Sequence, residues 1–166
     1  AIFPIKLGEK FRQLAQKGLG RDVDLEAGMF LIMEFGYPNS DPQACRESLD
    51  SLARQLEQNL DMEADPTQTV IALTQLLFQQ ENFKGNQNNY MDPDNSYLNK
   101  VLEHKTGLPI TLSALCVLVA SRLGLPIVGI GLPGHYIAKY NLPQGGIYFD
   151  PFHQGQTLTR ADCIKI

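Results

Sequence analysis

The apolar positions between residues 42 and 60 recur with the period of an α-helix. They follow one another at spacings of four, three, four and four: Cys45, Leu49, Leu52, Leu56 and Leu60. This spacing places the side chains on one face, so the segment is predicted to be an amphipathic helix. Asp41 and Pro42 support its start, because aspartate is a good N-cap and proline fits the first helical turn. On this face Cys45 is interpreted as a small core residue.

Further helices are predicted in the same half of the chain. Asp65-Pro66 repeats the start signal and precedes another apolar face, formed by Val70, Leu73 and Leu77. Residues 8–18 are predicted to form a short amphipathic helix closed by Gly18. Asp24 is a candidate N-cap for a helix whose apolar positions are dense enough for burial: Met29, Phe30, Ile32, Met33 and Phe35. Residues 1–81 are therefore predicted to form a helical subdomain.

The segment 109–123 differs from these helices because it is apolar almost all round. Pro109 and Gly124 mark its ends, and a helix without a polar face is expected at the centre of a domain. A shorter helix is predicted at 96–105. The preceding residues, 82–95, form the longest loop and are rich in Asn, Asp, Gly and Pro. This loop is either a functional segment or a run of turns stabilised by Asn and Asp side chains.

After residue 124 the pattern changes to short runs of β-branched and aromatic residues bounded by Pro and Gly. Strands are predicted at about 126–131, 134–140 and 147–151. Helices followed by a small antiparallel sheet define an α+β fold, in which the sheet packs on the central helix. A length of 166 residues suits a single domain, with a helical subdomain at 1–81 and a core at 82–166.

Charge and cysteine usage narrow the partners and the compartment. The formal net charge is −4, and no basic cluster suggests nucleic-acid binding. No apolar run approaches the ~20 residues of a membrane-spanning helix, so no membrane partner is expected. Cys45, Cys116 and Cys163 are widely spaced and form neither a CxxC pair nor a His/Cys cluster. Free thiols in a cytoplasmic protein are therefore expected.

One histidine and one aspartate lie where the last two predicted strands meet. Antiparallel partners keep a constant sum of residue numbers, and a four-residue loop at 141–144 would make it 285, placing His135 opposite Asp150. A six-residue loop would give 287 and make them diagonal neighbours on one face, whereas an odd loop would separate them. The carboxylate could orient the imidazole for general base catalysis or form a purely structural hydrogen bond.

These segments resemble a known family. "RLGLPIVGIGLPGHYIAKY" followed by "IYFDPF" is similar to the end of the core of the transglutaminase-like (papain-related) superfamily. "LIMEFGYP", "YMDPDNSYLNKVLEHKTGLPITLSAL", "GLPGHY" and "DPFHQGQTL" resemble its bacterial SirB-type branch, whose members are commonly followed by tetratricopeptide repeats. The resemblance covers roughly residues 22–162. It implies a Cys-His-Asp triad with its histidine at His135 and its aspartate at Asp150.

The resemblance also implies a cysteine in the first turn of the central helix, where the helix N-terminus lowers the pKa of a thiol. Pro109 stands in that place. Cys116 lies seven residues further on, two turns into an apolar helix, where burial should raise its pKa. Thr111 and Ser113 are alternative hydroxyl nucleophiles, although both also suit the first turns of a helix.

Two functions follow from this pattern. In the first, the domain has lost its thiol chemistry and is a protein-binding or regulatory module, with a peptide or protein partner in the cleft floored by His135 and Asp150 and edged by residues 82–95. In the second, it is a thiol- or hydroxyl-dependent amide hydrolase or acyltransferase with His135 as the base. The absent first-turn cysteine favours the module. A metal held by His135, Asp150 and His153 is a weaker alternative, and no metal or cofactor is expected.

Overall fold

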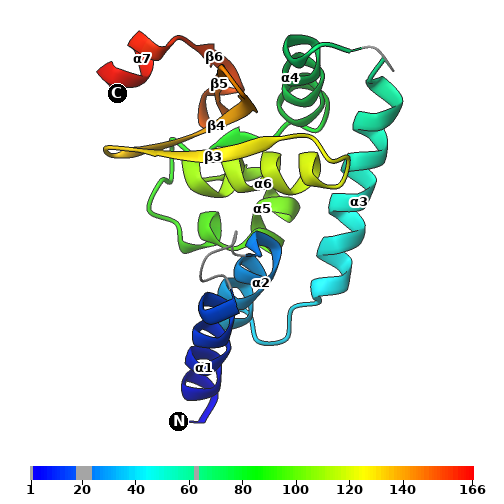
Figure 1. The fold of residues 1–166 in the computed structure, drawn as a ribbon. Helices are drawn as coiled ribbons and strands as arrows, with labels where there is room; N and C mark the ends of the chain where they lie inside the picture. Colours follow the sequence, from blue (N-terminus) through cyan, green and yellow to red (C-terminus); the bar gives the residue numbers. More distant parts are fainter. Residues whose placement is uncertain (1, 18–23, 62–63) are drawn as a thin grey trace.

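The computed structural model describes residues 2–17, 24–61 and 64–166, and its first half is helical (Figure 1). The helices are α1 (Ile2–Lys17), α2 (Leu25–Gly36), α3 (Pro42–Asn59) and α4 (Pro66–Thr74), and α4 continues into the π-helical segment η1 (Gln75–Gln80). The predicted N-caps are confirmed, because the carboxylates of Asp24, Asp41 and Asp65 accept backbone N–H groups of the turns that they precede.

The second half alternates short helices with strands. It contains η2 (Pro93–Ser96), α5 (Leu98–His104), α6 (Pro109–Ser121), η3 (Pro151–His153) and α7 (Arg160–Lys165), where η2 and η3 are 3-10 turns. As predicted, α6 is the central helix, and its buried residues face all directions. Leu112, Leu115 and Cys116 have no exposed surface. A helix that is apolar all round must be covered on every side, which sets the arrangement of the other elements.

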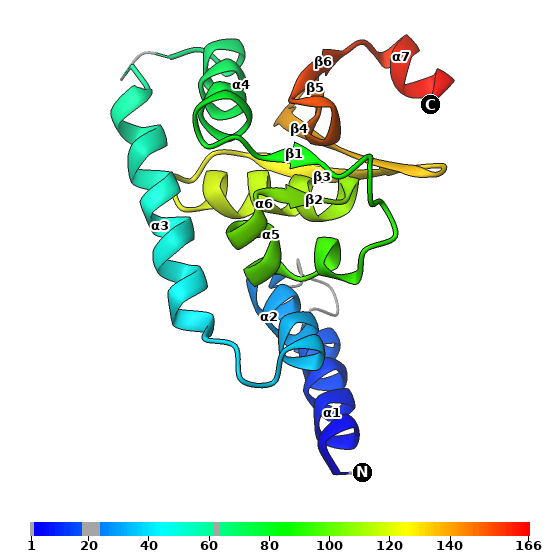
Figure 2. The same ribbon diagram turned by 180° about the vertical axis from the view of Figure 1, so that it is seen from behind.

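Four antiparallel strands cover α6 on one side: β3 (Ile127–Leu132), β4 (His135–Leu142), β5 (Gly145–Asp150) and β6 (Gln156–Leu158), in the order β3-β4-β5-β6. The helix contacts β3 and β4 directly, and α2, α3 and α5 also pack against it. Seen from behind, a second, parallel pair joins β1 (Lys84–Gly85) to β2 (Thr106–Gly107) beside α6 (Figure 2). The fold is therefore α+β, as predicted.

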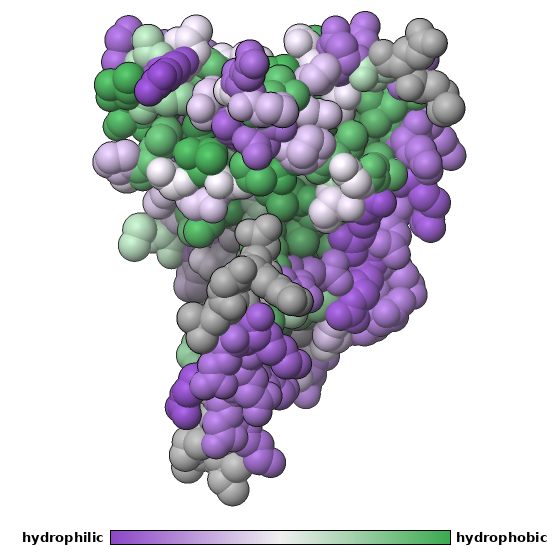
Figure 3. All heavy atoms as spheres, viewed as in Figure 1, coloured by the Kyte–Doolittle hydropathy of each residue, from purple (hydrophilic) through white to green (hydrophobic). Residues whose placement is uncertain are grey.

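The hydrophobic core is one cluster that joins the two halves of the chain. It runs from Met29 in α2 through the leucines of α3 and α6 to Phe152 in η3. In Figure 3, hydrophilic residues cover α1 and α3, whereas hydrophobic residues gather at the level of the sheet and α6. Cys45 is buried on the inner face of α3, as its place in the apolar stripe predicted.

Several predictions from the sequence, on boundaries, burial and the number of elements, were wrong. The helix predicted at 8–18 begins at Ile2, and Gly18 lies outside the described residues. In α2, Ile32 and Phe35 are not buried but 38% and 60% exposed, because six apolar positions in seven residues cannot all face one core. The predicted loop 82–95 contains β1 and part of η2, and β6 and α7 had not been predicted.

Candidate functional site

A tight turn positions His135 at the start of β4. Leu132 pairs with His135, so Pro133 and Gly134 alone connect β3 to β4, and Gly134 has the positive φ of 73° that such a turn requires. Because β3 runs back along α6, this turn lies at the end of the molecule where α6 begins (Figure 1). His135 thus lies at the end of the sheet nearest the first turn of the central helix.

Asp150 reaches His135 from the last position of β5. The pairing of Ala138 with Phe149 gives a sum of 287, so the register is the second of the two predicted and the four-residue loop is wrong. The ladder continues to Leu142 and Gly145, so the loop has two residues rather than the six predicted with this register. His135 and Asp150 are therefore diagonal neighbours, and 2.7 Å separates His135 Nε2 from Asp150 Oδ2. The side-chain pairing expected from the sequence is confirmed; its catalytic role stays a prediction.

His153 joins this pair through the 3-10 turn that follows β5. Pro151 ends the strand, and Asp150 caps the turn: its Oδ1 accepts the backbone N–H groups of Phe152 at 3.0 Å and His153 at 3.3 Å. This cap brings His153 Nδ1 to 2.8 Å from Asp150 Oδ2, the atom that also contacts His135. Sequence reasoning considered His153 only as a metal ligand. An aspartate cap followed three residues later by histidine is the local signal for this contact.

The Asp150 carboxylate is ionised within this cluster. Burial alone would raise its pKa, but the hydrogen bonds from His153 and His135 outweigh burial and hold the pKa below its usual value. A carboxylate can only accept hydrogen bonds, so the ring nitrogens facing it, His135 Nε2 and His153 Nδ1, both carry protons. In the neutral imidazoles the lone pairs are then on His135 Nδ1 and His153 Nε2, and each of these nitrogens can act as a base or a ligand.

Two pockets meet at His153. One, of about 450 Å³, lies beside the cluster and is lined by His135, Asp150, His153 and uncharged residues: Pro133, Gly134, Gln156, Leu158 and Ile166. The other, of about 430 Å³, lies between Lys84, Thr106 and His153 and includes residues 85–88. The side chain of His153 is 50% exposed, whereas those of His135 and Asp150 are 13% and 4% exposed. The segment 82–95 edges only the second pocket, which reaches His153, whereas the pocket lined by His135 and Asp150 includes no residue of this segment. The single cleft expected from the sequence is therefore divided in two.

The candidate nucleophiles do not join this cluster. Pro109 is the first residue of α6, as predicted, and the structure shows that it is buried. Cys116 is fully buried, and burial raises the pKa of its thiol far above the usual range. Thr111 Oγ1 donates to Asn95 O at 2.8 Å and accepts from Leu108 N at 2.9 Å. Ser113 is fully buried, and among the described residues its hydroxyl has no hydrogen-bond partner.

The Asn- and Asp-rich segment before α5 is held by its own side chains. Buried Asn95 donates to the carbonyls of Asn89 and Tyr90 and accepts from Asn86 Nδ2 at 2.9 Å. Its backbone carbonyl accepts from Thr111, which fixes the segment to the first turn of α6. The side-chain-stabilised turns of one sequence interpretation are therefore present in this part, and a function of the segment stays a prediction. Its rim position beside Phe152 follows from the Tyr90 ring contact.

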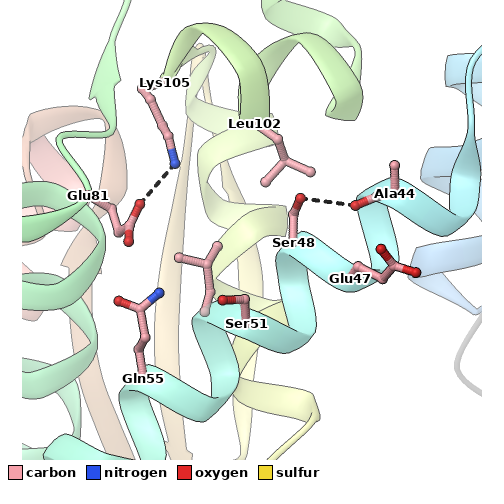
Figure 4. Close-up of a pocket in the computed structure, with 9 residues that line it drawn as sticks. Ala44, Glu47, Ser48, Ser51, Gln55, Glu81, Leu102 and Lys105 are labelled. Carbon is pink, nitrogen blue, oxygen red and sulfur yellow. Dashed lines mark hydrogen bonds and ion pairs between the residues drawn. The ribbon is translucent and has the colours of Figure 1, made fainter.

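A further pocket lies along α3 (Figure 4), and its lining includes no residue of the His-Asp-His cluster. Ser48, Ser51 and Gln55 of α3 line one side, and the ion pair between Glu81 and Lys105, 2.9 Å long, closes the other. Its lining contains neither cysteine nor histidine. In the described contacts Ser48 donates to Ala44 O and Glu81 pairs with Lys105, so no serine of this pocket is hydrogen-bonded to a carboxylate.

The fold and the cluster together define a class of protein. An α+β core whose strands after a buried central helix bring a histidine and an aspartate into hydrogen-bond contact is a transglutaminase-like core. A family model described as "Transglutaminase-like superfamily" matches residues 43–166, so the chain belongs to this superfamily.

Proteins similar to this chain come from bacteria and from mammals. A UPF0162 protein of Xylella fastidiosa is 34% identical over 136 residues, which are 82% of this chain and 48% of that protein. UPF0162 protein PA3419 of Pseudomonas aeruginosa is 30% identical over 141 residues, 85% of this chain and 50% of that protein. These matches agree with the SirB-type branch inferred from the sequence.

F-box only protein 21 of Mus musculus is 33% identical over 116 residues, which are 64% of this chain and 18% of that protein. The matched segments are 48% and 50% of the two bacterial relatives, so this chain spans about half the length of those proteins. No solved structure matches it. In the described part of the chain, no helix has the length and apolar character needed to cross a bilayer.

Proposed function

We propose that this chain is a transglutaminase-like domain that has lost its thiol nucleophile and serves as a protein- or peptide-binding module. The observation that carries the proposal is the first turn of α6, where buried Pro109 stands in place of the family's cysteine. The nearest thiol, Cys116, is enclosed in the core, and burial raises its pKa. Acyl transfer through a thiolate needs an accessible sulfur of low pKa, and Cys116 is neither accessible nor acidic.

The hydroxyl groups of α6 do not replace the sulfur. The Thr111 hydroxyl is engaged by Asn95 and Leu108, and withdrawing it would release the rim segment from the helix. The Ser113 hydroxyl is sealed in the core. Activation by a His-Asp pair requires hydrogen-bond contact between the imidazole and the nucleophile, and the described contacts of His135 are with Asp150, Phe152 and His153.

The surface around the cluster suits an extended peptide. Both pockets include His153; apolar Leu158 and Ile166 line one of them, and amide side chains of Asn86, Gln87 and Asn88 line the other. Apolar contacts with a few amide donors and acceptors are the usual composition of a peptide-binding groove. The occurrence of a similar segment as 18% of F-box only protein 21 also supports a module that functions within longer chains.

One observation favours the alternative, a hydrolase or acyltransferase that uses the His-Asp pair. Asp150 orients His135 through Nε2 and leaves Nδ1 with its lone pair, which is the arrangement of a general base. Such an enzyme would need a nucleophile from elsewhere, for example a water molecule, and this requirement separates it from the module.

The test combines chemistry and binding in the folded protein. Fluorogenic amide substrates and acyl-acceptor amines should give no turnover above that of His135→Ala, and turnover that disappears in this variant would contradict the module. Peptides selected on the protein from a displayed random library should bind at least about tenfold more weakly to His153→Glu, because the substitution places a charge in the shared edge of both pockets. Ser51→Arg in the α3 pocket is the matched control and should bind normally.

A further inference from the structure

We propose that His135, Asp150 and His153 form a binding site for one divalent transition-metal cation of the Zn²⁺ class, open toward the pocket beside Gln156. This inference does not depend on the proposed peptide-binding function, because the same three side chains could hold an ion whether or not a peptide is bound. It goes beyond the sequence-based expectation, in which a metal was the weaker alternative.

The donor set carries the proposal. The potential ligand atoms of the three residues all lie within 4.8 Å of one another. They are two imidazole nitrogens and one carboxylate oxygen, a combination that proteins use for Zn²⁺ and for related first-row ions. The three residues come from the start of β4, the end of β5 and the η3 turn. Regular elements rather than a long loop therefore place all three ligands.

Small movements would convert the hydrogen-bonded cluster into a coordination sphere. A tetrahedral ion with ligands at about 2.1 Å separates them from each other by about 3.4 Å. Asp150 Oδ2 now lies 2.7 Å from His135 Nε2 and 2.8 Å from His153 Nδ1, so these two contacts must lengthen by about 0.6–0.7 Å. His153, whose side chain is half-exposed, can make most of this adjustment. Asp150 stays anchored, because Oδ1 is held by two backbone N–H groups.

The charge of Asp150 and the protons of the two imidazoles are also compatible with a bound cation. The carboxylate supplies one negative charge, and neither lysine nor arginine lines the pocket beside the cluster. On metal binding, the proton on the ring nitrogen facing Asp150 moves to the other ring nitrogen, which leaves a lone pair for the ion on the nitrogen that faces the carboxylate. The ion replaces two hydrogen bonds to Oδ2 by coordination of the same three atoms.

Three protein ligands leave at least one coordination position open to the pocket. Closed structural zinc sites use four protein ligands, whereas sites with three hold water or an external ligand at the remaining position. Carboxylate or imidazole groups of a partner could occupy that position. Among the described residues, the outward ring nitrogens, His135 Nδ1 and His153 Nε2, have no hydrogen-bond partner. Such outer hydrogen bonds raise the affinity for a metal ion by about 10–100-fold, and this site lacks them. A dissociation constant in the micromolar range is therefore expected.

The experiment measures metal binding directly and needs no peptide. The protein is freed of metal with a chelator, transferred to a non-coordinating buffer and titrated with ZnCl₂ by calorimetry and with CoCl₂ by visible absorption. We expect one equivalent per chain and the intense ligand-field bands of four- or five-coordinate Co²⁺. His153→Ala should weaken binding by about a hundredfold or more, since it removes a ligand from an exposed position without touching the core.

Two variants serve as matched controls. His104→Ala removes the third histidine of the chain, which is exposed on α5 and pairs only weakly with Glu103, and Cys163→Ser removes the most accessible thiol. Both should bind Zn²⁺ as the unmodified protein does. The proposal is overturned if the unmodified protein binds no ion in this range, if His153→Ala binds as tightly, or if either control loses the bound ion. Thermal unfolding of each metal-free variant verifies that its fold is intact.

Discussion

At the scale of single residues, Asp150 organises the site because one buried carboxylate accepts four hydrogen bonds, two from backbone N–H groups and two from imidazoles. Asp150→Asn keeps the shape of the side chain but places an NH₂ group, which donates hydrogen bonds, where the carboxylate accepts them from all four neighbouring groups. We expect the free energy of unfolding to fall by about 1.5–3 kcal/mol in chelator-treated protein, measured by urea denaturation. His153→Ala, which loses a half-exposed partner, should cost clearly less. Equal stability of Asp150→Asn and the unmodified protein would show that the hydrogen bonds contribute little.

The thiols offer a second test at this scale. The pKa of Cys116 is raised by burial, that of Cys45 by burial and Asp41, and that of Cys163 by partial burial and the charge of Asp162. A raised pKa means less thiolate at a given pH, so all three should react slowly near neutrality, with Cys163 first because it is the least buried.

Alkylation of the native protein across pH, quantified by mass spectrometry, checks this order. Cys116 should remain unmodified until the protein unfolds. Fast modification of Cys116 at neutral pH that slows in His135→Ala would return a thiol mechanism to consideration.

At the scale of elements, the first turns of α6 contain two buried hydroxyls with opposite roles. Thr111 bonds to Asn95 and Leu108, whereas Ser113 has no partner among the described residues. Thr111→Val should therefore lower the free energy of unfolding by about 1–3 kcal/mol and expose residues 86–92 to hydrogen exchange. Ser113→Ala should leave stability unchanged or raise it by about 1 kcal/mol, because it removes an unsatisfied buried group.

The pair also tests the hydroxyl-nucleophile hypothesis. Both variants are compared by urea denaturation and by hydrogen-exchange mass spectrometry of the 86–92 segment. If Ser113→Ala were the more destabilising of the two, the Ser113 hydroxyl would have a partner that the described contacts do not include. Loss of an amide-hydrolysing activity in either variant would instead support an enzyme.

The elements also show what the sequence could predict. Helix starts were found because aspartate caps and the following prolines are local signals that need no tertiary information. The two-residue strands β1 and β2 were missed because so short a segment has no periodicity, and their pairing depends on chain segments about 20 residues apart. The hairpin loop was placed too wide because Gly145 and Gly146 adopt positive φ angles of 119° and 150°, which lets the ladder extend through both glycines to Gly145.

Like the helix starts, the site was predictable only where a local sequence signal determines the position of a residue. The facing positions of His135 and Asp150 follow from alternation along two strands, which any even loop preserves. His153 was not assigned to the pair, because its position depends on the turn that Asp150 caps after Pro151. A cap is visible in sequence only once the end of the preceding strand is known.

At the scale of the whole molecule, Arg122 ties the sheet-bearing half to the helical half. Its guanidinium contacts Glu26 of α2 at 2.7 Å and Asp50 of α3 at 2.5 Å, and its side chain is only 17% exposed. Arg122→Ala removes both ion pairs and the packing of the side chain, so we expect a loss of about 1–2 kcal/mol and a Tm lower by roughly 3–8 °C.

Differential scanning calorimetry measures this effect, and Glu103→Gln is the matched control. Glu103 pairs with Lys100 within α5 and is 60% exposed, so its loss should shift Tm by no more than about 1–2 °C. A similar shift in both variants would mean that Arg122 contributes only as a surface ion pair.

The core cluster predicts that the two halves of the chain unfold together. Six leucines of α3, α4 and η1 are almost or completely buried against the second half: Leu49, Leu52, Leu56, Leu73, Leu76 and Leu77. Burial of each contributes about 1.5–3 kcal/mol, so together they match the whole stability of a typical domain, about 5–15 kcal/mol. The fragment 82–166 should therefore not fold alone, whereas the full chain should unfold in one urea transition seen equally by circular dichroism and tyrosine fluorescence. A folded fragment, or two separate transitions, would make residues 82–166 an independent domain and leave the helical half as an appended unit.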